Sequence, residues 1–418
     1  MFGLTLALAI VALCRPESVA QTPAPTREEK WKQDLNEFAK GFAENQKDFD
    51  KLYPRERFGR EVAALQASAE GTSDSDLVLA LMKLVASAHV GHTVVQPPNG
   101  PRGFHRLPLG LYWYSDGLAV TSAAEQYTQA LGTRVVRIGS MTPEKLEAAV
   151  APYISYENDV WLHQQSPSFM TIVELLRHLG IASDDGSVEF TMAKPGDKPF
   201  TMKISPANPG VRVPLVNVTD AFHIPTPLFR KQPQSYYWYE YLAEQRTLYI
   251  QYNRCQDDPQ LSFAEFTKKV LDFADAHPVE RVIVDLRFNS GGNSNVIKPL
   301  ENGLKARPAL SKYGHLYALM GRATFSSGLL AAVDFRDDLH AILIGEPSGE
   351  KPNSYGEIKY LTLPNSKVEV QYSTKFFTII KNGDPTTFDP DVSVPHSLAD
   401  ALAGRDPALE AALHHPLQ

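Results

Sequence analysis

Hydrophobic positions in the early part of the chain follow a helical period. From Trp31 onward, apolar side chains recur every three or four positions over 28–52, the spacing of an amphipathic helix. The same spacing predicts a second helix around 58–70 and a third that begins near Ser73, since serine is favoured at helix N-caps. We expect these three helices to pack together as a helical region over 21–104.

Farther along the chain the apolar positions alternate instead. The stretch LGLYWYSDGLAVTSA alternates about Asp116-Gly117, which is typical of a β-hairpin with a tight turn. More strand-like segments follow at LGTRVVRIGS and over 188–204. The pattern predicts a compact β-rich domain over 105–205. Residues 206–240, with several prolines and a run of aromatic side chains, are expected to form a connector or flap.

Strand and helix patterns alternate through the C-terminal part of the chain. TLYIQY, RVIVDLRF, HLYALMG and AILIG are apolar runs of strand length, with helical patterns over 262–276 and 326–337 between them. A continuous apolar run such as RVIVDLRF is typical of a strand that is buried on both faces of a parallel sheet. The alternation predicts βαβ units, and therefore an α/β domain with a mostly parallel sheet over 241–418.

The N-terminal segment is typical of a secretory signal. Residues 3–13 form an apolar run of 11, too short for the about 20 helical residues that span a bilayer. Small residues follow, up to Ala20. We expect residues 1–20 to be removed and the protein to be exported, either to the periplasm or as a secreted chain. A lipid-anchored Cys14 is the alternative, disfavoured because Leu13 is larger than that processing step normally accepts.

Composition narrows the possible functions. The 418 residues include 41 basic and 48 acidic side chains, for a net charge of −7, and no run of Lys or Arg. This balance argues against a nucleic-acid partner. Two cysteines are too few for a disulfide scaffold or a cysteine-rich zinc site, and removal of the signal would leave only Cys255. No later stretch approaches transmembrane length, and composition leaves the oligomeric state open.

One serine stands where a strand is predicted to meet a helix, in Thr324-Phe325-Ser326-Ser327-Gly328. A hydroxyl at a helix N-terminus lies among unpaired amides, and these together with the helix dipole favour the negative charge of an alkoxide or oxyanion. The alternative is that Ser326 merely caps the helix. Thr324 stands where the α/β-hydrolase elbow G-x-S-x-G has its first glycine, so that motif is not matched.

A glycine-rich loop, NSGG at 289–292, follows the buried strand RVIVDLRF. Its successive amides can converge on an anion, and a plain strand-to-helix turn is the alternative. The loop lacks the Lys-Ser/Thr of a P-loop and the third glycine of a dinucleotide fingerprint, so we expect no nucleotide cofactor. We also expect no metal, because His89 and His92 have no carboxylate or cysteine beside them at a recognised spacing.

Four motifs, in one order, resemble those of the tricorn and carboxy-terminal-processing serine peptidase family: DLRFNSGG, TFSSG, LIGEPSGEKPN and FDPDVSV. A helical start, a GHT sequence and the β-rich segment agree with this resemblance. It implies a crotonase-like (ClpP/crotonase) α/β catalytic domain and a PDZ-like domain over 105–205. It also implies that peptide bonds are hydrolysed through an acyl-enzyme, without a cofactor.

The resemblance assigns roles to several residues of this chain. Ser326, the serine after Thr-Phe, matches the family's nucleophile. The amide of Ser327 and one amide from Gly291 or Gly292 match the expected oxyanion hole. Losing one such donor typically lowers turnover by about 100- to 1000-fold.

The general base differs between the branches of the family. His92 in the GHT sequence matches the histidine of the tricorn-like branch, and Lys351 lies 25 residues after Ser326, as the lysine of the processing branch does. Asp384 stands where the tricorn relay has a glutamate, and Gly91 where it has a serine. We favour His92, because a histidine with a pKa near 6.5 needs no perturbation, whereas a lysine base must be buried. Lys351 also lacks the usual glycine-flanked FGKG setting.

The sequence therefore predicts an exported serine peptidase that acts on unfolded segments or C-terminal tails. Its PDZ-like domain would capture substrate by strand addition. The alternative is a catalytically silent binding protein for peptides or hydrophobic ligands, since the interphotoreceptor retinoid-binding protein carries a similar fold. Ser326 together with two candidate bases favours the enzyme.

Overall fold

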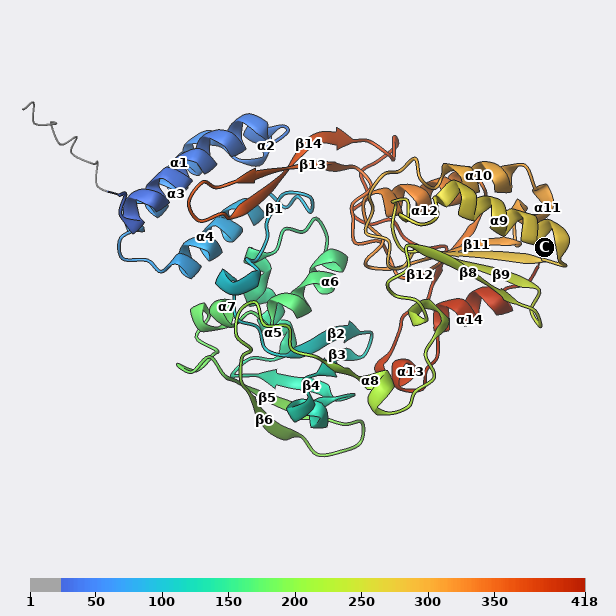
Figure 1. The fold of residues 1–418 in the computed structure, drawn as a ribbon, viewed down its shortest axis with the longest axis horizontal. Coiled ribbons are helices and arrows are strands. Elements are labelled where there is room, and N and C mark those ends of the chain that lie inside the picture. Colours follow the sequence, from blue (N-terminus) through green and yellow to red (C-terminus); the bar gives the residue numbers. More distant parts are fainter. Residues whose placement is uncertain (1–23, 418) are drawn as a thin grey trace, which may run out of the picture.

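The computed structural model describes residues 24–417, so the predicted signal peptide and Cys14 lie outside the described residues. Figure 1 shows an N-terminal lobe of helices and strands beside a C-terminal lobe that is built on a twisted sheet. The helices are α1 (Arg27–Asn45), α2 (Phe49–Leu52), α3 (Arg55–Ser68), α4 (Asp74–Ala86), α5 (Pro143–Val150), α6 (Asp159–Phe169), α7 (Val173–His178), α8 (Val218–Ala221), α9 (Phe263–Ala276), α10 (Lys298–Lys305), α11 (Pro308–Ser311), α12 (Ser327–Asp337), α13 (Leu398–Leu402) and α14 (Pro407–His414). The strands are β1 (Val94–Val95), β2 (Leu109–Tyr114), β3 (Gly117–Ala123), β4 (Arg134–Ile138), β5 (Val188–Ala193), β6 (Phe200–Ile204), β7 (Val216–Asn217), β8 (Tyr237–Leu242), β9 (Thr247–Tyr252), β10 (Arg281–Asp285), β11 (Leu316–Met320), β12 (Ile342–Gly345), β13 (Ser354–Thr362), β14 (Glu369–Phe377) and β15 (Val392–Ser393).

The predicted N-terminal helices form, with one difference. Ser73 caps α4 through its side chain, which accepts a hydrogen bond from the amide of Asp76, as the sequence predicts. The helix predicted over 28–52 is interrupted between α1 and α2, because Gln46 is extended and Asp48 adopts a left-handed backbone with φ 53°. The last turn of the predicted helix is therefore set at an angle to the first helix. The prediction of one continuous helix there was wrong.

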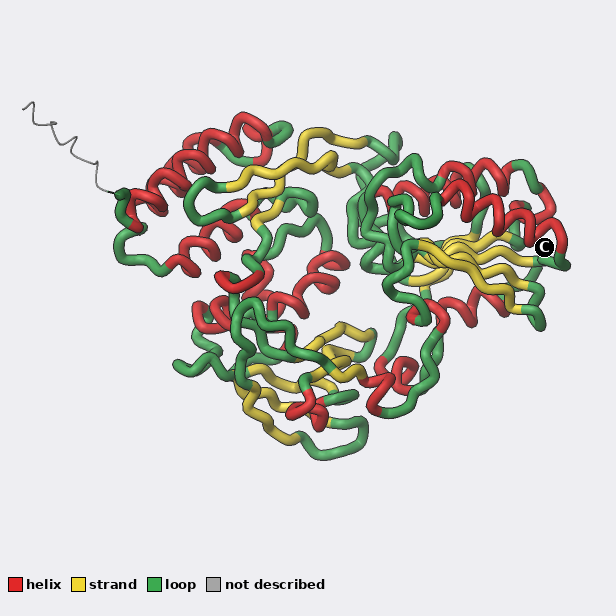
Figure 2. Tube along the Cα trace, in the orientation of Figure 1, coloured by secondary structure: helices red, strands yellow, loops and turns green. Residues whose placement is uncertain are grey.

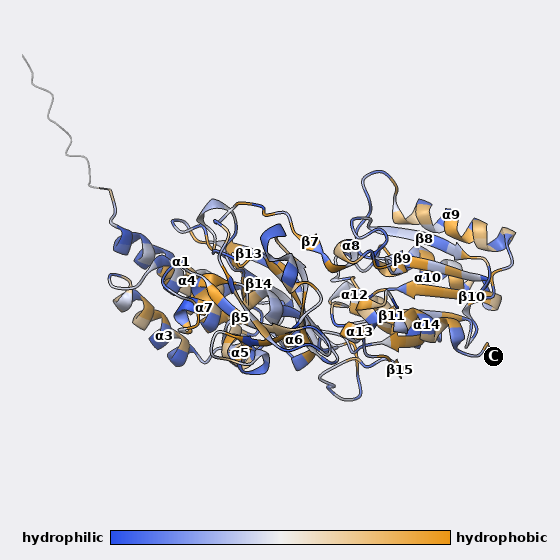
Figure 3. Cartoon of the chain, turned by 90° about the horizontal axis from the view of Figure 1, so that it is seen from below, coloured by the Kyte–Doolittle hydropathy of each residue, from blue (hydrophilic) through white to orange (hydrophobic). Residues whose placement is uncertain are grey.

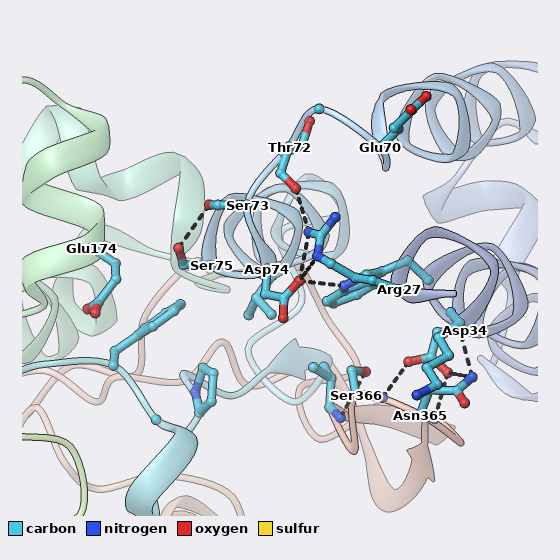
Figure 4. A pocket seen from close by; sticks show the side chains of 18 residues that line it. Arg27, Asp34, Glu70, Thr72, Ser73, Asp74, Ser75, Glu174, Asn365 and Ser366 are labelled. Atoms are coloured by element: carbon cyan, nitrogen blue, oxygen red, sulfur yellow. Dashed lines mark hydrogen bonds and ion pairs between the residues drawn. The ribbon is translucent and has the colours of Figure 1, made fainter. Parts of the chain in front are cut away.

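A hairpin from the C-terminal part of the chain completes a sheet in the N-terminal lobe. β14 pairs antiparallel with β13 on one side and with β1 on the other. At the turn of the hairpin, the amides of Asn365 and Ser366 donate hydrogen bonds of 2.8 and 2.7 Å to the carboxylate of Asp34 in α1 (Figure 4). Tyr372 of β14 belongs to the same hydrophobic core as Trp31. The hairpin is thereby fixed against the N-terminal helices.

The β-rich segment contains an antiparallel sheet of order β2-β3-β4-β5-β6, and β7 pairs with β3. The hairpin at Asp116-Gly117 joins β2 to β3, as the alternation predicts. Helices α6 and α7 lie in the same segment and were not predicted, since Pro167 inside α6 interrupts its apolar period. The boundaries at 105 and 205 stay predictions.

The C-terminal lobe contains a sheet of order β15-β12-β11-β10-β9-β8, in which only β8 runs antiparallel to its neighbour. Figures 1 and 2 show α9, α10 and α12 on one face of this sheet and α14 on the other. Val282 and Val284 of β10 pack in the core beneath α9, and Ile283 packs in the core beneath α14. Burial on both faces explains the continuous apolar run, so the prediction of a mostly parallel sheet is confirmed.

Three loops meet at one edge of this sheet, because the carboxyl ends of neighbouring parallel strands lie side by side. Residues 286–292 follow β10, residues 321–326 follow β11 and residues 346–353 follow β12. Figure 3 shows apolar strands enclosed by helices with hydrophilic outer faces. Within residues 24–417, no helix is both long and apolar enough to span a bilayer.

Candidate active site

Ser326 lies on a strained turn between β11 and α12. Its backbone has φ 53° and ψ −129°, a conformation that non-glycine residues rarely adopt and that is concentrated at functional sites. Although Ser326 occupies the N-cap position, its side chain makes no capping hydrogen bond to α12. The structure therefore does not support capping as the reason for a serine here. Instead the strained turn places the hydroxyl at the N-terminal end of α12, free of the helix amides.

The glycine-rich loop packs directly against this serine. A Cβ added to Gly291, which has φ 105°, would lie 2.5 Å from Cβ of Ser326 and 3.0 Å from the amide nitrogen of Ser327. No side chain fits in that space. The hydroxyl of Ser327 donates a 2.7 Å hydrogen bond to the carbonyl of Gly292, which ties the loop to the start of α12.

Of the two glycine amides proposed for the oxyanion hole, one is already engaged in a hydrogen bond and the other is not. The amide of Gly291 donates to the side-chain oxygen of Asn289 at 2.9 Å. Gly292 instead forms an isolated parallel β-bridge with Cys255. The two hydrogen bonds of this bridge run from the Cys255 amide to the Gly291 carbonyl and from the Asn293 amide to the Cys255 carbonyl, so they do not use the Gly292 amide. The amides of Gly292 and Ser327 make no hydrogen bond among the described residues, so these two are the donors open to an oxyanion.

His92 lies beside Ser326, on the turn that follows α4. Both residues line one cavity of about 430 Å³. The imidazole is 7% exposed, and its ring centroid lies 4.7 Å from that of Phe325. Burial lowers the pKa of His92 to about 4, which keeps the ring neutral at physiological pH. A neutral imidazole is the form that can accept a proton.

The carboxyl beside His92 comes from Glu350, which the sequence analysis did not single out. Its Oε1 lies 3.4 Å from Nδ1 of His92, without the alignment of a hydrogen bond, and accepts a 2.7 Å hydrogen bond from the hydroxyl of Ser354. Its Oε2 accepts from the main-chain amide of Ser326. Burial, and then the charge of Glu157, raise the pKa of Glu350 to about 8. One carboxyl therefore contacts both the backbone of Ser326 and the imidazole of His92.

Lys351 and Asp384 are placed elsewhere. Nζ of Lys351 lies 2.6 Å from Oδ2 of Asp384, in an ion pair whose side chains are 27% and 61% exposed. Neither residue lines the cavity that holds Ser326 and His92. A lysine base needs apolar burial without a countercharge, and this setting is the opposite. The structure thus brings Ser326 and His92 together with the glycine loop. Lys351 and Asp384 pair with each other outside that cavity.

Apolar and polar side chains both line the cavity away from Ser326 and His92. Trp161 stacks on Phe325 with ring centroids 4.2 Å apart, and Phe325 in turn packs on His92. The remaining apolar lining consists of Val94, Ile154, Phe169 and Ile358. Three glutamines line the cavity as well: Gln96, Gln165 and Gln371. Within the described part of the chain, no three His, Cys, Asp or Glu side chains gather as a metal site would require.

Neither a protein-family model nor a curated protein matches the sequence. Solved structures do match the fold. Mature CPAF complexed with lactacystin is matched at a TM-score of 0.62 and 12% identity, over 92% of this chain and 97% of that one. The photosystem II D1 C-terminal processing protease is matched at 0.40 and 13%, over 92% and 99%, and the tricorn protease at 0.43 and 12%, over 92% and 36%.

These matches define the class of structure. The chain has a mixed α/β fold with several sheets, shared with CPAF over nearly its whole length. The D1 C-terminal processing and tricorn proteases, which represent the family that the sequence motifs resemble, are among the structures matched. At these identities the CPAF match establishes the fold alone. The two lower-scoring matches carry no argument about the site.

Proposed function

We propose that this protein is a serine peptidase. The observation that carries the proposal is the turn at Ser326, which is strained, makes no cap, and lies in one cavity with a neutral buried imidazole. Two amides that make no hydrogen bond within the described part of the chain, those of Gly292 and Ser327, lie in the segments that meet there. Nucleophile, base and oxyanion donors are the three elements that acyl transfer needs.

The proposed reaction begins when Oγ of Ser326 attacks the carbonyl carbon of a peptide bond and its proton passes to His92. The oxyanion that forms is bound by the amides of Gly292 and Ser327. His92 then gives its proton to the leaving amine as the C–N bond breaks, which leaves an acyl-enzyme. Water, deprotonated by His92, attacks the ester, and the carboxylic acid and the free serine are released. Glu350, whose Oε1 lies 3.4 Å from Nδ1 of His92, stabilises the charged imidazole when its carboxyl is ionised.

An extended chain suits the space around the serine. A second cleft, of about 1120 Å³, lies on the other side of the glycine loop, and Ser290 and Gly292 line both spaces. A polypeptide that crosses the loop can occupy both at once. The apolar lining around Trp161 favours an apolar substrate side chain next to the scissile bond. Action on unfolded segments or C-terminal tails, export after signal cleavage, and the crotonase-like and PDZ-like assignments belong to this proposal.

Labelling with a fluorophosphonate probe tests the proposal. The wild-type protein is expected to form a covalent adduct at Ser326, identified by mass spectrometry of the modified peptide, and Ser326→Ala is expected to lose it. Thr324→Ser, which keeps a hydroxyl two residues away, serves as a matched control and is expected to keep the adduct at Ser326. An unlabelled wild-type protein, under conditions that label a known serine peptidase, would instead favour the silent binding protein.

A further inference from the structure

Glu157 joins the segments that carry His92 and Glu350. It lies in the loop just before α6, and its carboxylate accepts hydrogen bonds from the main-chain amides of Gly91 and Lys351, the latter at 3.3 Å. These two residues directly precede His92 and directly follow Glu350. One side chain from the β-rich segment therefore sets the spacing between the proposed base and the acid beside it.

The carboxyls of Glu157 and Glu350 lie close enough for the charge of Glu157 to act on Glu350, and neither carboxyl forms an ion pair with Lys or Arg among the described residues. The titratable groups around them are His92, from the turn after α4, and Lys351, from the loop after β12. Nζ of Lys351 is engaged 2.6 Å from Asp384. The remaining partners of Glu350 are the hydroxyl of Ser354 and the amide of the nucleophile, which are neutral. Two acids in one buried site cannot both ionise freely, so they are expected to share a proton.

We propose that Glu157 is a positioning residue for the peptidase reaction, which holds Glu350 against His92 and shares one proton with it. This inference rests on the function proposed above. When the pair keeps its proton, Glu350 is neutral and stabilises the imidazolium only weakly. When Glu350 ionises, its charge supports proton transfer to His92. The pair therefore makes the reactivity of Ser326 rise with pH.

The raised pKa values of Glu157 and Glu350 agree with two acids that share one proton. Burial raises the pKa of Glu157 to about 7, and burial together with the charge of Glu157 raises that of Glu350 to about 8. Because a negative Glu157 disfavours a negative Glu350, removing the first charge must lower the pH at which the second acid ionises. For two carboxylates in a partly buried site, the shift is about one pH unit.

The test is the pH dependence of the rate at which the fluorophosphonate labels Ser326. Glu157→Gln keeps an oxygen for the two amides and removes the charge, so the midpoint of the profile is expected to move about one unit lower. Glu350→Gln is expected to flatten the profile. Glu147→Gln is the matched control: Glu147 is a buried glutamate in α5 that pairs with His163 and Ser166, and its loss is expected to leave the midpoint in place.

A Glu157→Gln profile with an unchanged or higher midpoint would overturn the proposal, and so would a uniform loss of rate at every pH. A second readout does not depend on activity. In protein labelled with ¹³C at glutamate Cδ, the Glu350 signal is expected to titrate at lower pH in Glu157→Gln than in wild type, and an unmoved titration would refute the shared proton. If Ser326 is never labelled, the peptidase proposal fails, and the NMR titration still decides whether the pair exists.

Discussion

Substitution of Gly291 by alanine tests the geometry of the proposed oxyanion site. The added Cβ would lie 2.5 Å from Cβ of Ser326, 3.0 Å from its hydroxyl oxygen and 3.0 Å from the amide nitrogen of Ser327. Ordinary carbon–carbon contacts are about 3.5–4.0 Å, so the loop and the nucleophile must separate by about 1 Å. Displacing one oxyanion donor costs about 2.7–4 kcal/mol of transition-state stabilisation, or about 100- to 1000-fold in turnover.

Backbone strain must be separated from this steric effect. Gly291 has φ 105°, and Gly383, in the loop after β14, has φ 110° with no atom within 4 Å of an added Cβ. Both Gly→Ala variants are expected to lose about 1–3 kcal/mol of folding stability through strain. Only Gly291→Ala is expected to lose labelling and peptide cleavage by about 100-fold or more.

The assay compares the two variants at temperatures at which circular dichroism shows both to be folded. Fluorophosphonate labelling rate and cleavage of an unfolded protein substrate are measured for each. If Gly291→Ala labels within about tenfold of Gly383→Ala, the loop does not constrain the nucleophile, and the assignment of the oxyanion site is refuted.

Three further predictions concern stability. Phe325→Ala removes a ring that packs between Trp161 and His92. It is expected to lower the free energy of unfolding by about 3–5 kcal/mol in urea titrations and to slow the labelling of Ser326. An unaffected labelling rate would mean that the ring does not hold the imidazole. Arg287→Ala leaves two buried carboxylates, one of them Asp406, without their countercharge and is expected to cost about 3–5 kcal/mol, which equal urea midpoints would contradict. Burial raises the pKa of Asp406, but the charge and hydrogen bonds of its partners, Arg287 first among them, outweigh burial, so the pKa is lowered in the folded protein. The ion pair therefore stabilises the fold above about pH 4, and this stabilisation is lost as the pH falls further. A wild-type free energy of unfolding that does not decrease between pH 5 and pH 3 would contradict this prediction.

Local patterns predicted the elements whose causes are local. The cap at Ser73, the hairpin at Asp116-Gly117 and the buried strand around Val282–Val284 all depend on neighbouring residues, and each forms as expected. The break at Asp48 was missed, because a left-handed residue within an otherwise helical pattern leaves no periodic signal. The β13–β14 hairpin was missed as well, although its two strands are neighbours in the sequence, and only its pairing with β1 joins distant segments.

The site shows the same division. Ser326 and the glycine loop carry compact motifs, and the sequence singled them out. Glu350 carries none, because an acidic residue in a loop is usually solvated, and its burial depends on four segments that meet only in the folded chain. Glu157 lies outside all four family-like motifs, so no motif in the sequence indicated it. The one available signal for Glu350 was its position next to Lys351, within the third family-like motif.

In the proposed mechanism His92, and not Lys351, activates Ser326. The most direct measurement is the labelling rate of Ser326 in His92→Ala and in Lys351→Ala, with folding of each variant verified by its unfolding midpoint. We expect a loss of about 100-fold or more for His92→Ala and a change within about threefold for Lys351→Ala. A Lys351→Ala variant that no longer labels, beside a His92→Ala variant that labels at the wild-type rate, would contradict it.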